Sequence, residues 1–234
     1  MLVHGAWGNP SDWLWVRRPL EAGGIHVVAP DLPSHQSATA GLKDDSEAVR
    51  AAIRACDPPV VVVGWSYGGD VITAAADAEP DVAGLVYVSS VPRDEGFVQD
   101  DDWLNGNEHL IWFPDGTYAL DNRWWLDDEA GTTFPPELRE VLRDHPRRPI
   151  SPHAMANRQV GSAWRAIPAV VLMGHTDYFL TESDLTWMRT QPALDVRMLD
   201  CDHFVPFRQP RVVADTVLEL LARSSGLSAG AASR

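Results

Sequence analysis

Short apolar runs alternate with amphipathic stretches over the first ninety residues. Four runs have the length and the branched side chains of buried strands: residues 2–4, 26–29, 60–63 and 82–89. Three stretches between or after them have helical spacing: residues 12–22, 44–56 and about 67–78. Ser11 is a possible cap for the first of these helices, which Gly23 and Gly24 end. Short strands that alternate with helices predict an α/β fold, in which helices cover both faces of a mostly parallel sheet.

The alternation stops after residue 90 and returns near residue 167. The intervening residues 91–166 hold five tryptophans, many acidic residues and several prolines without a clear strand pattern, so we expect an insertion. Two further strands and two further helices follow: strands at 169–173 and 196–199, helices at 181–191 and 210–223. The predicted organisation is therefore a core, an inserted cap and a disordered tail: residues 1–90 with 167–225, 91–166, and 226–234.

One hexapeptide, Gly-Trp-Ser-Tyr-Gly-Gly at residues 64–69, directly follows the apolar run 60–63. A Gly-x-Ser-x-Gly pattern between a strand and a helix is typical of a sharp turn that exposes a serine hydroxyl. Side chains at Gly64 and Gly68 would collide with neighbouring elements, and the helix N-terminus favours negative charge beside Ser66. Such a pentapeptide also occurs as a plain glycine-rich turn. The interpretation of Ser66 as a nucleophile therefore requires a base and an orienting acid elsewhere in the chain.

Later strand ends supply candidates for both partners. Asp177 comes just beyond the strand at 169–173 and His203 just beyond the strand at 196–199. Parallel strands end at one edge of a sheet, so both side chains are expected near Ser66. Serine, aspartate and histidine in this chain order are typical of α/β-hydrolases.

Several other residues compete for these roles. Asp94 follows the strand at 82–89 and is the main alternative acid. Asp202 adjoins His203 and is poorly placed to face the imidazole, and Asp184 is expected inside the helix that Thr181 caps. Asp200 is a further candidate acid, and His175 is interpreted as structural.

An oxyanion requires two fixed donors, usually backbone N–H groups. The Tyr67 amide, at the start of the helix after Ser66, is one candidate. The other is the Ala6 amide, with Trp7 as the alternative, in the turn that follows the first strand. Gly5 permits a close approach of the backbone at this turn.

These motifs resemble those of serine α/β-hydrolases, and within them the small esterase branch with plant methyl-ester esterases, hydroxynitrile lyases and bacterial pyrethroid-type carboxylesterases. The matching stretches are Leu-Val-His-Gly-Ala-Trp at residues 2–7, the turn at 64–69, the turn at 174–177, and Asp-His-Phe at 202–204. The resemblance spans nearly the whole chain and implies the same triad and oxyanion hole, with residues 91–166 as a cap.

Two departures narrow the expected activity. The hydroxynitrile lyases of this branch have threonine where this chain has Gly5 and lysine where it has Phe204, which disfavours lyase activity. Epoxide hydrolases and haloalkane dehalogenases on this fold have aspartate at the position of Ser66, which disfavours both of these activities. The chain also begins inside what resembles the third strand of the family, so we expect the usual first hairpin to be absent and a sheet edge to require protection.

Composition excludes several classes of partner. The formal net charge of -14 disfavours binding to nucleic acid and to anionic membranes. The sequence has no secretory signal and no apolar run near the roughly 20 residues that cross a bilayer, so we expect a soluble, cytoplasmic monomer or homodimer. Two cysteines, Cys56 and Cys201, provide neither a disulfide framework nor a zinc site, and we expect no metal and no organic cofactor.

The sequence thus predicts a carboxylesterase-type hydrolase that uses Ser66, His203 and Asp177. Its aromatic cap and the lack of a basic patch favour an uncharged, fairly apolar ester or lactone as the substrate. Trp7, Trp112 and Trp125 are candidate substrate contacts, although packing is the usual role of tryptophan. The alternatives are a cofactor-free lyase or cyclase that uses the triad for proton transfer, and a non-catalytic receptor on the same fold.

Overall fold

The structure, a computed structural model, describes residues 1–98, 107–121, 134–155 and 158–231. In this part of the chain, five parallel strands form a central sheet in the order β1-β2-β3-β6-β7. Their bounds are Leu2–Val3 (β1), Val60–Trp65 (β2), Val82–Val88 (β3), Ala169–Gly174 (β6) and Leu194–Leu199 (β7). The α/β fold class predicted from the sequence is confirmed.

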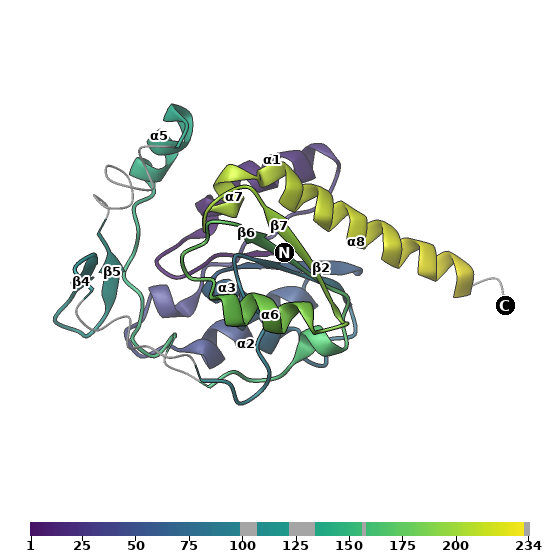
Figure 1. The fold of residues 1–234 in the computed structure, drawn as a ribbon, viewed down its shortest axis with the longest axis horizontal. Helices are drawn as coiled ribbons and strands as arrows, with labels where there is room; N and C mark the ends of the chain where they lie inside the picture. Colours follow the sequence, from purple (N-terminus) through teal and green to yellow (C-terminus); the bar gives the residue numbers. More distant parts are fainter. Residues whose placement is uncertain (99–106, 122–133, 156–157, 232–234) are drawn as a thin grey trace.

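Helices cover both faces of this sheet, as Figure 1 shows. Helix α1 (Leu14–Ala22) packs against α8 (Pro210–Ala231) on one face, and α2 (Leu42–Arg54) packs against α3 (Tyr67–Ala75) on the other. Strand β2 lies between β1 and β3 and is buried along its whole length. A strand covered on both faces needs apolar side chains at every position, which explains the run of four valines at its start.

The parallel arrangement brings the candidate residues to one edge of the sheet. Ser66 follows β2, Asp177 lies three residues beyond the end of β6, and His203 lies four residues beyond the end of β7. Strands β6 and β7 pair directly up to Gly174 and Leu199, so the turns that carry Asp177 and His203 begin side by side. The register of the parallel strands thus brings Ser66, Asp177 and His203 to the same edge of the sheet.

Residues 91–166, which we call the inserted segment, add no described strand to the central sheet. They contain an antiparallel hairpin of β4 (Leu110–Trp112) and β5 (Tyr118–Leu120), helix α5 (Pro136–Asp144) and a 3₁₀ turn, η5 (Ala163–Arg165). Figure 1 shows β4, β5 and α5 beside the sheet and not stacked on it. The hairpin escaped prediction because strands of three residues are too short to establish an alternating pattern.

The first three elements differ in detail from the prediction. Residues 26–29, predicted as a strand, form no described strand. This stretch nevertheless contacts β1, because the Leu2 N–H donates to the Val28 carbonyl. A 3₁₀ turn, η1 (Pro10–Trp13), precedes α1, and the Asn9 side chain caps it by accepting from the Ser11 N–H. Ser11 is therefore not the cap, because proline at position 10 starts the turn two residues earlier than the periodicity indicates.

The closing elements are longer than predicted. A short helix, α7 (Val205–Arg208), precedes α8, and α8 continues to Ala231 instead of giving way to a disordered tail at residue 226. Alanine, leucine and serine there are compatible with a helix, and composition alone does not separate a small polar tail from a helix end. Helix α6 (Glu182–Arg189) is capped by Thr181 as predicted. A further 3₁₀ turn, η2 (Pro33–His35), follows the loop after residue 29.

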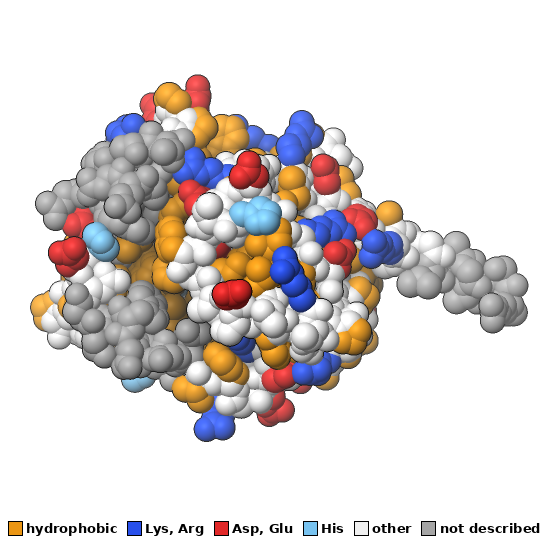
Figure 2. All heavy atoms as spheres, viewed as in Figure 1, with side chains coloured by type: hydrophobic (Ala, Val, Ile, Leu, Met, Phe, Trp, Pro, Cys, Tyr) orange, Lys and Arg blue, Asp and Glu red, His pale blue; other side chains and the backbone are white. Residues whose placement is uncertain are grey.

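Charged side chains of both signs lie on the surface of the protein. On the face shown in Figure 2, acidic and basic side chains are interspersed. Within the described ranges, none of the helices combines the length and the apolar character that a bilayer crossing requires.

Candidate active site

Ser66 lies at the sharp turn between β2 and α3 in a strained backbone conformation. Its φ of 53° and ψ of -124° are disfavoured for a residue with a side chain. The turn is held by two hydrogen bonds, one from the Ser66 N–H to the Val88 carbonyl (2.9 Å) and one from the Gly69 N–H to the Ser66 carbonyl (2.8 Å). Non-glycine residues in such conformations cluster at functional sites.

Glycine is required on both sides of this serine. A Cβ atom at Gly64 would collide with the Gly68 carbonyl, and one at Gly68 would lie 2.5 Å from the Val3 carbonyl oxygen of β1. The turn is therefore packed against its own helix and against the first strand. The collisions predicted from the sequence at Gly64 and Gly68 are therefore collisions with backbone atoms.

His203 and Asp177 form a buried pair beyond the adjacent ends of β6 and β7. The Nδ1 atom of His203 lies 2.9 and 3.1 Å from the two carboxylate oxygens of Asp177. Such a partner favours the tautomer with its proton on Nδ1 and leaves Nε2 as the acceptor. Asp177 also accepts from the Phe179 N–H (3.0 Å), and the Trp65 indole donates to the His203 carbonyl (3.0 Å). The imidazole and its acid are thus fixed from both sides.

The competing acids have other partners. Asp94 is partly exposed and forms a bidentate pair with Arg165 at 2.6 Å for both contacts. Asp184 pairs with Arg93 (2.9 Å), and Asp202 pairs with Arg208 (3.0 Å).

The remaining competitors are Asp200 and His175. No described contact links Asp200 to His203, and His175 is exposed and does not contribute to the cavity described below. The structure therefore brings Asp177, and none of the alternatives, to His203.

The loop at residues 5–9, here called the oxyanion loop, packs against the serine turn. A Cβ atom at Gly5 would lie 2.9 Å from the Trp65 carbonyl oxygen and 3.2 Å from the Cβ atom of Ser66. Trp7, the next residue but one, has a φ of +58°, a second strained position beside the first. Within the described residues, neither the Ala6 amide nor the Tyr67 amide donates a hydrogen bond. Both N–H groups are therefore available at the serine turn.

A cavity of about 530 Å³ collects these groups and is lined mainly by apolar side chains. Its lining includes all five main candidates together with Trp7: Ala6, Trp7, Ser66, Tyr67, Asp177 and His203. Trp112 is not part of the lining, because it is 52% exposed and stacks on Tyr118 of the neighbouring strand at 4.7 Å. This corrects its prediction as a substrate contact. Trp125 lies outside the described residues.

Sequence reasoning missed several polar residues of this cavity: Asp70, Arg93, Asn107, His109 and Arg147. Asp70 lies one helical turn after Ser66 on α3, so its spacing from Ser66 is the one signal that the sequence offers. Burial raises the pKa of the Asp70 carboxyl to about 7, and the nearby Arg93 guanidinium offsets part of that rise. Asp70 is therefore a carboxyl group that titrates in the neutral range beside the serine.

Asp70→Asn should increase the free energy of unfolding at pH 8 while changing it little at pH 4. The unfolded chain ionises Asp70 near 3.8 and the folded chain near 7, so stability falls as pH rises between these values and stays lowered above them. Full separation of the two pKa values corresponds to at most about 4 kcal/mol, and we expect about 1–3 kcal/mol because the carboxyl group faces the cavity. Urea denaturation at both pH values measures this, with the exposed Asp57→Asn as the control. A difference independent of pH would contradict it.

Within the described part of the chain, no three histidine, cysteine, aspartate or glutamate side chains are grouped as a metal site requires. Cys56 and Cys201 are free thiols. The chemistry that the described groups can supply is that of a hydroxyl, an imidazole paired with a carboxylate, and fixed backbone amides.

Known proteins resemble the chain both in sequence and in structure. The profile of the alpha/beta hydrolase family matches residues 1–216. A pimeloyl-[acyl-carrier protein] methyl ester esterase from Stenotrophomonas maltophilia (strain R551-3) is 34% identical over 187 residues, which cover 74% of this chain and 67% of the relative. One from Xanthomonas campestris pv. campestris (strain B100) is 36% identical over 110 residues, 44% of this chain and 40% of the relative.

Solved structures resemble nearly the whole chain. A pyrethroid hydrolase from Sphingobium faniae JZ-2 has a TM-score of 0.71 at 21% identity, covering 93% of this chain and 94% of its own. A tomato methylketone synthase has a TM-score of 0.77 at 16% identity, with coverages of 95% and 96%. A polyneuridine aldehyde esterase has a TM-score of 0.72 at 19% identity, with coverages of 94% and 97%. At these identities the likeness shows the fold.

Proposed function

The chain belongs to the alpha/beta hydrolase family, and from this premise we propose that it cleaves a carboxylic ester or lactone through an acyl-enzyme on Ser66. The relatives that are named methyl ester esterases support an esterase-like function. The observation that carries the proposal is the contact of 2.9 Å between His203 Nδ1 and Asp177 in the wall of the cavity that Ser66 also lines.

The proposed reaction has two halves. His203 Nε2 accepts the proton of the Ser66 hydroxyl as its oxygen attacks the ester carbonyl carbon, and Asp177 stabilises the imidazolium that forms. The carbonyl oxygen becomes an oxyanion that accepts hydrogen bonds from the Ala6 and Tyr67 amides. Collapse of this intermediate breaks the bond to the alcohol, which leaves with the proton from His203. Water then attacks the acyl-enzyme by the same route and releases the carboxylic acid.

An uncharged, fairly apolar substrate fits the lining of the cavity. The arginines there are already paired with carboxylates, Arg93 with Asp184 at 2.9 Å and Arg147 with Asp12. A phosphate or carboxylate on the substrate would have to displace these pairs, at the cost of leaving an aspartate unpaired. The net charge of -14 further disfavours anionic substrates.

The inserted segment serves as the cap in this proposal. Asn107, His109 and Leu120 contribute to the cavity from its first half, and Arg147 and Met155 from its second. These side chains belong to the same cavity lining as Ser66. A substrate in the cavity would contact both parts of the protein, and the inserted segment would select its shape.

A fluorophosphonate probe and a small substrate panel test this function. We expect the probe to modify Ser66, identified by mass spectrometry of the labelled peptide, and we expect turnover of nitrophenyl butyrate but not of nitrophenyl phosphate. The heat-unfolded protein is the labelling control, since a serine without its base and oxyanion donors reacts poorly. A folded protein that neither reacts with the probe nor hydrolyses the butyrate would refute the proposal and favour a receptor on this fold.

A further inference from the structure

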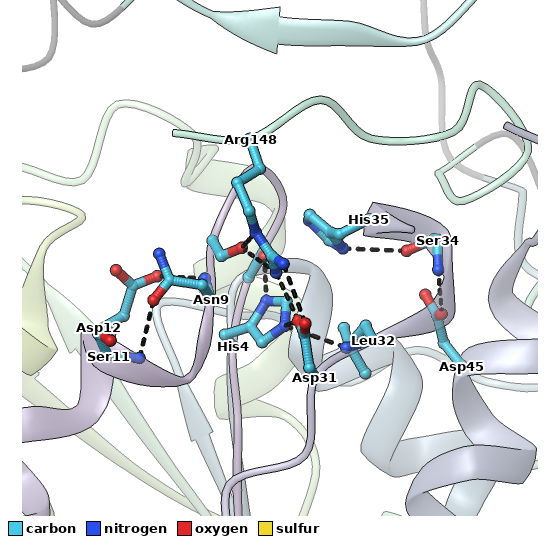
Figure 3. Close-up of polar contacts among 12 residues, drawn as sticks. His4, Asn9, Ser11, Asp12, Asp31, Leu32, Ser34, His35, Asp45 and Arg148 are labelled. Atoms are coloured by element: carbon cyan, nitrogen blue, oxygen red, sulfur yellow. Dashed lines mark hydrogen bonds and ion pairs between the residues drawn. The ribbon is translucent and has the colours of Figure 1, made fainter. Parts of the chain in front are cut away.

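Two consecutive arginines of the inserted segment, Arg147 and Arg148, contact the oxyanion loop and its flanks. They follow α5 and lie about 140 positions along the chain from that loop. Figure 3 shows Arg148 reaching down from the inserted segment to Asp31, with the His4 ring beside the contact. Neither arginine belongs to the set of groups that perform the proposed reaction.

Arg148 holds the carbonyl groups of the oxyanion loop directly. Its backbone N–H donates to the Trp7 carbonyl (2.9 Å), and its guanidinium donates to the Gly8 carbonyl through Nε (3.0 Å) and Nη2 (2.7 Å). Trp7 is the residue with a φ of +58°. The carbonyls of the strained residue and of its successor are therefore both fixed by one residue of the inserted segment.

Asp31 completes the arrangement and connects it to the first strand. Arg148 donates to both of its carboxylate oxygens, at 3.0 and 2.5 Å, and His4 Nε2 lies 3.3 Å from one of them. Burial alone would raise the pKa of Asp31, but its contacts with His4 and Arg148 outweigh burial and hold the pKa well below its ordinary value. His4 Nδ1 in turn donates to the Gly5 carbonyl at 3.0 Å. The loop is thus fixed at Gly5 as well as at Trp7 and Gly8.

Arg147 reaches the other side of the same loop. Its guanidinium forms a bidentate pair with Asp12, and both side chains are 1% exposed. Asp12 also accepts from the Asn9 N–H at 3.2 Å, at the end of the oxyanion loop. A fully buried bidentate pair tolerates little displacement, because either partner alone would be a charge without compensation.

We propose that Arg147 and Arg148 are positioning residues, which seat the oxyanion loop so that the Ala6 amide faces the developing oxyanion. This inference rests on the proposed hydrolase function. Trp7 would relax toward an ordinary conformation without these contacts, and the neighbouring Ala6 amide would lose its orientation. The inserted segment then contributes to rate as well as to substrate selection.

Arg148→Met is the test variant, because the partial exposure of Arg148 makes it less critical for folding than the buried Arg147. We expect its kcat for nitrophenyl butyrate to fall by about 10- to 100-fold, with KM changed less than about threefold, since misplacement of an oxyanion donor affects the transition state and not ground-state binding. Affinity for a trifluoromethyl ketone, whose adduct with Ser66 carries an oxyanion, should fall by the same factor as kcat/KM. Amide exchange over residues 5–9 should become faster.

The chain offers a matched control in Arg165→Met. Arg165 is in the same inserted segment and forms an equally bidentate pair with Asp94, but it lies outside the cavity lining and away from the oxyanion loop. We expect its kcat, ketone affinity and exchange at residues 5–9 to match the wild type. Arg148→Lys should recover part of the loss, because lysine can donate to one carbonyl but cannot bridge Gly8 and Asp31 with a planar fork.

The outcomes separate this inference from the hydrolase proposal. Wild-type protein without turnover or labelling would refute the hydrolase function, whereas the exchange of residues 5–9 would still report whether Arg148 seats the loop. Should Arg148→Met fail to fold, Asp31→Asn decides, with an expected effect between those of the lysine variant and the wild type. Unchanged exchange in the folded variants, or a fall in kcat without any loss of ketone affinity, would overturn the positioning role.

Discussion

Ser66→Ala is expected to lower kcat for an uncharged nitrophenyl ester by about 10⁴-fold or more, because loss of the nucleophile disables the whole triad. The variant keeps a small side chain at a φ of 53°, so the turn retains its strain and its contacts with Val88 and Gly69. The fold and the cavity should therefore survive. Residual rate over water should remain, since the two amides and the cavity still bind the substrate. The measurement is steady-state kinetics, with thermal unfolding of the same sample.

A control for this substitution is Ser37→Ala, which removes an exposed hydroxyl in the loop that follows η2. Ser37 bonds to Thr39 and contributes nothing to the cavity lining. Its kcat should stay within about twofold of the wild type, as is usual for surface substitutions. If Ser66→Ala keeps its turnover while Ser37→Ala behaves normally, the nucleophile has been assigned to the wrong residue.

Position at strand ends is what made the three chemical groups predictable from the sequence. Short valine-rich runs identify buried strands, and residues just after parallel strands share one sheet edge. Asp177 and His203 are 26 positions apart in the chain, yet both follow such a run, and the structure pairs them. Glycine at positions 64 and 68 adds a backbone constraint that few alternative structures satisfy. Ser66, Asp177 and His203 could therefore be predicted from local sequence patterns.

Other parts of the site depend on contacts that no local pattern records. The pair of Asp12 with Arg147 joins residues 135 positions apart, and both appear in the sequence as ordinary charged residues. Asp70 gains its raised pKa from burial under neighbouring elements, which the sequence does not reveal. Trp112 illustrates the reverse error, because an aromatic residue in an insertion looks like a pocket residue but stacks on Tyr118 at the surface.

Asp177→Asn is expected to lower kcat by about 10³- to 10⁴-fold while leaving the fold intact. Asparagine matches aspartate in size, so its side chain stays beside His203 Nδ1, but its NH₂ group cannot accept a hydrogen bond from the Nδ1–H and favours the other imidazole tautomer. Its carbonyl oxygen also provides no charge to stabilise the imidazolium. The expected loss therefore affects kcat far more than KM, and the pH dependence of kcat/KM should shift with the altered basicity of His203.

The decisive comparison is with Asp94→Asn, because Asp94 is the acid that chain position alone leaves open. Its carboxylate is committed to Arg165 through two contacts of 2.6 Å at the surface, and hydrogen bonding to that guanidinium holds its pKa below the ordinary value. Exposed pairs of this kind contribute at most about 1 kcal/mol to stability, so Asp94→Asn should leave kcat within about twofold of the wild type. If kcat fell strongly in Asp94→Asn and only slightly in Asp177→Asn, the acid that orients His203 would be Asp94. Its carboxylate would then have to leave Arg165 and contact His203 from beyond the end of β3.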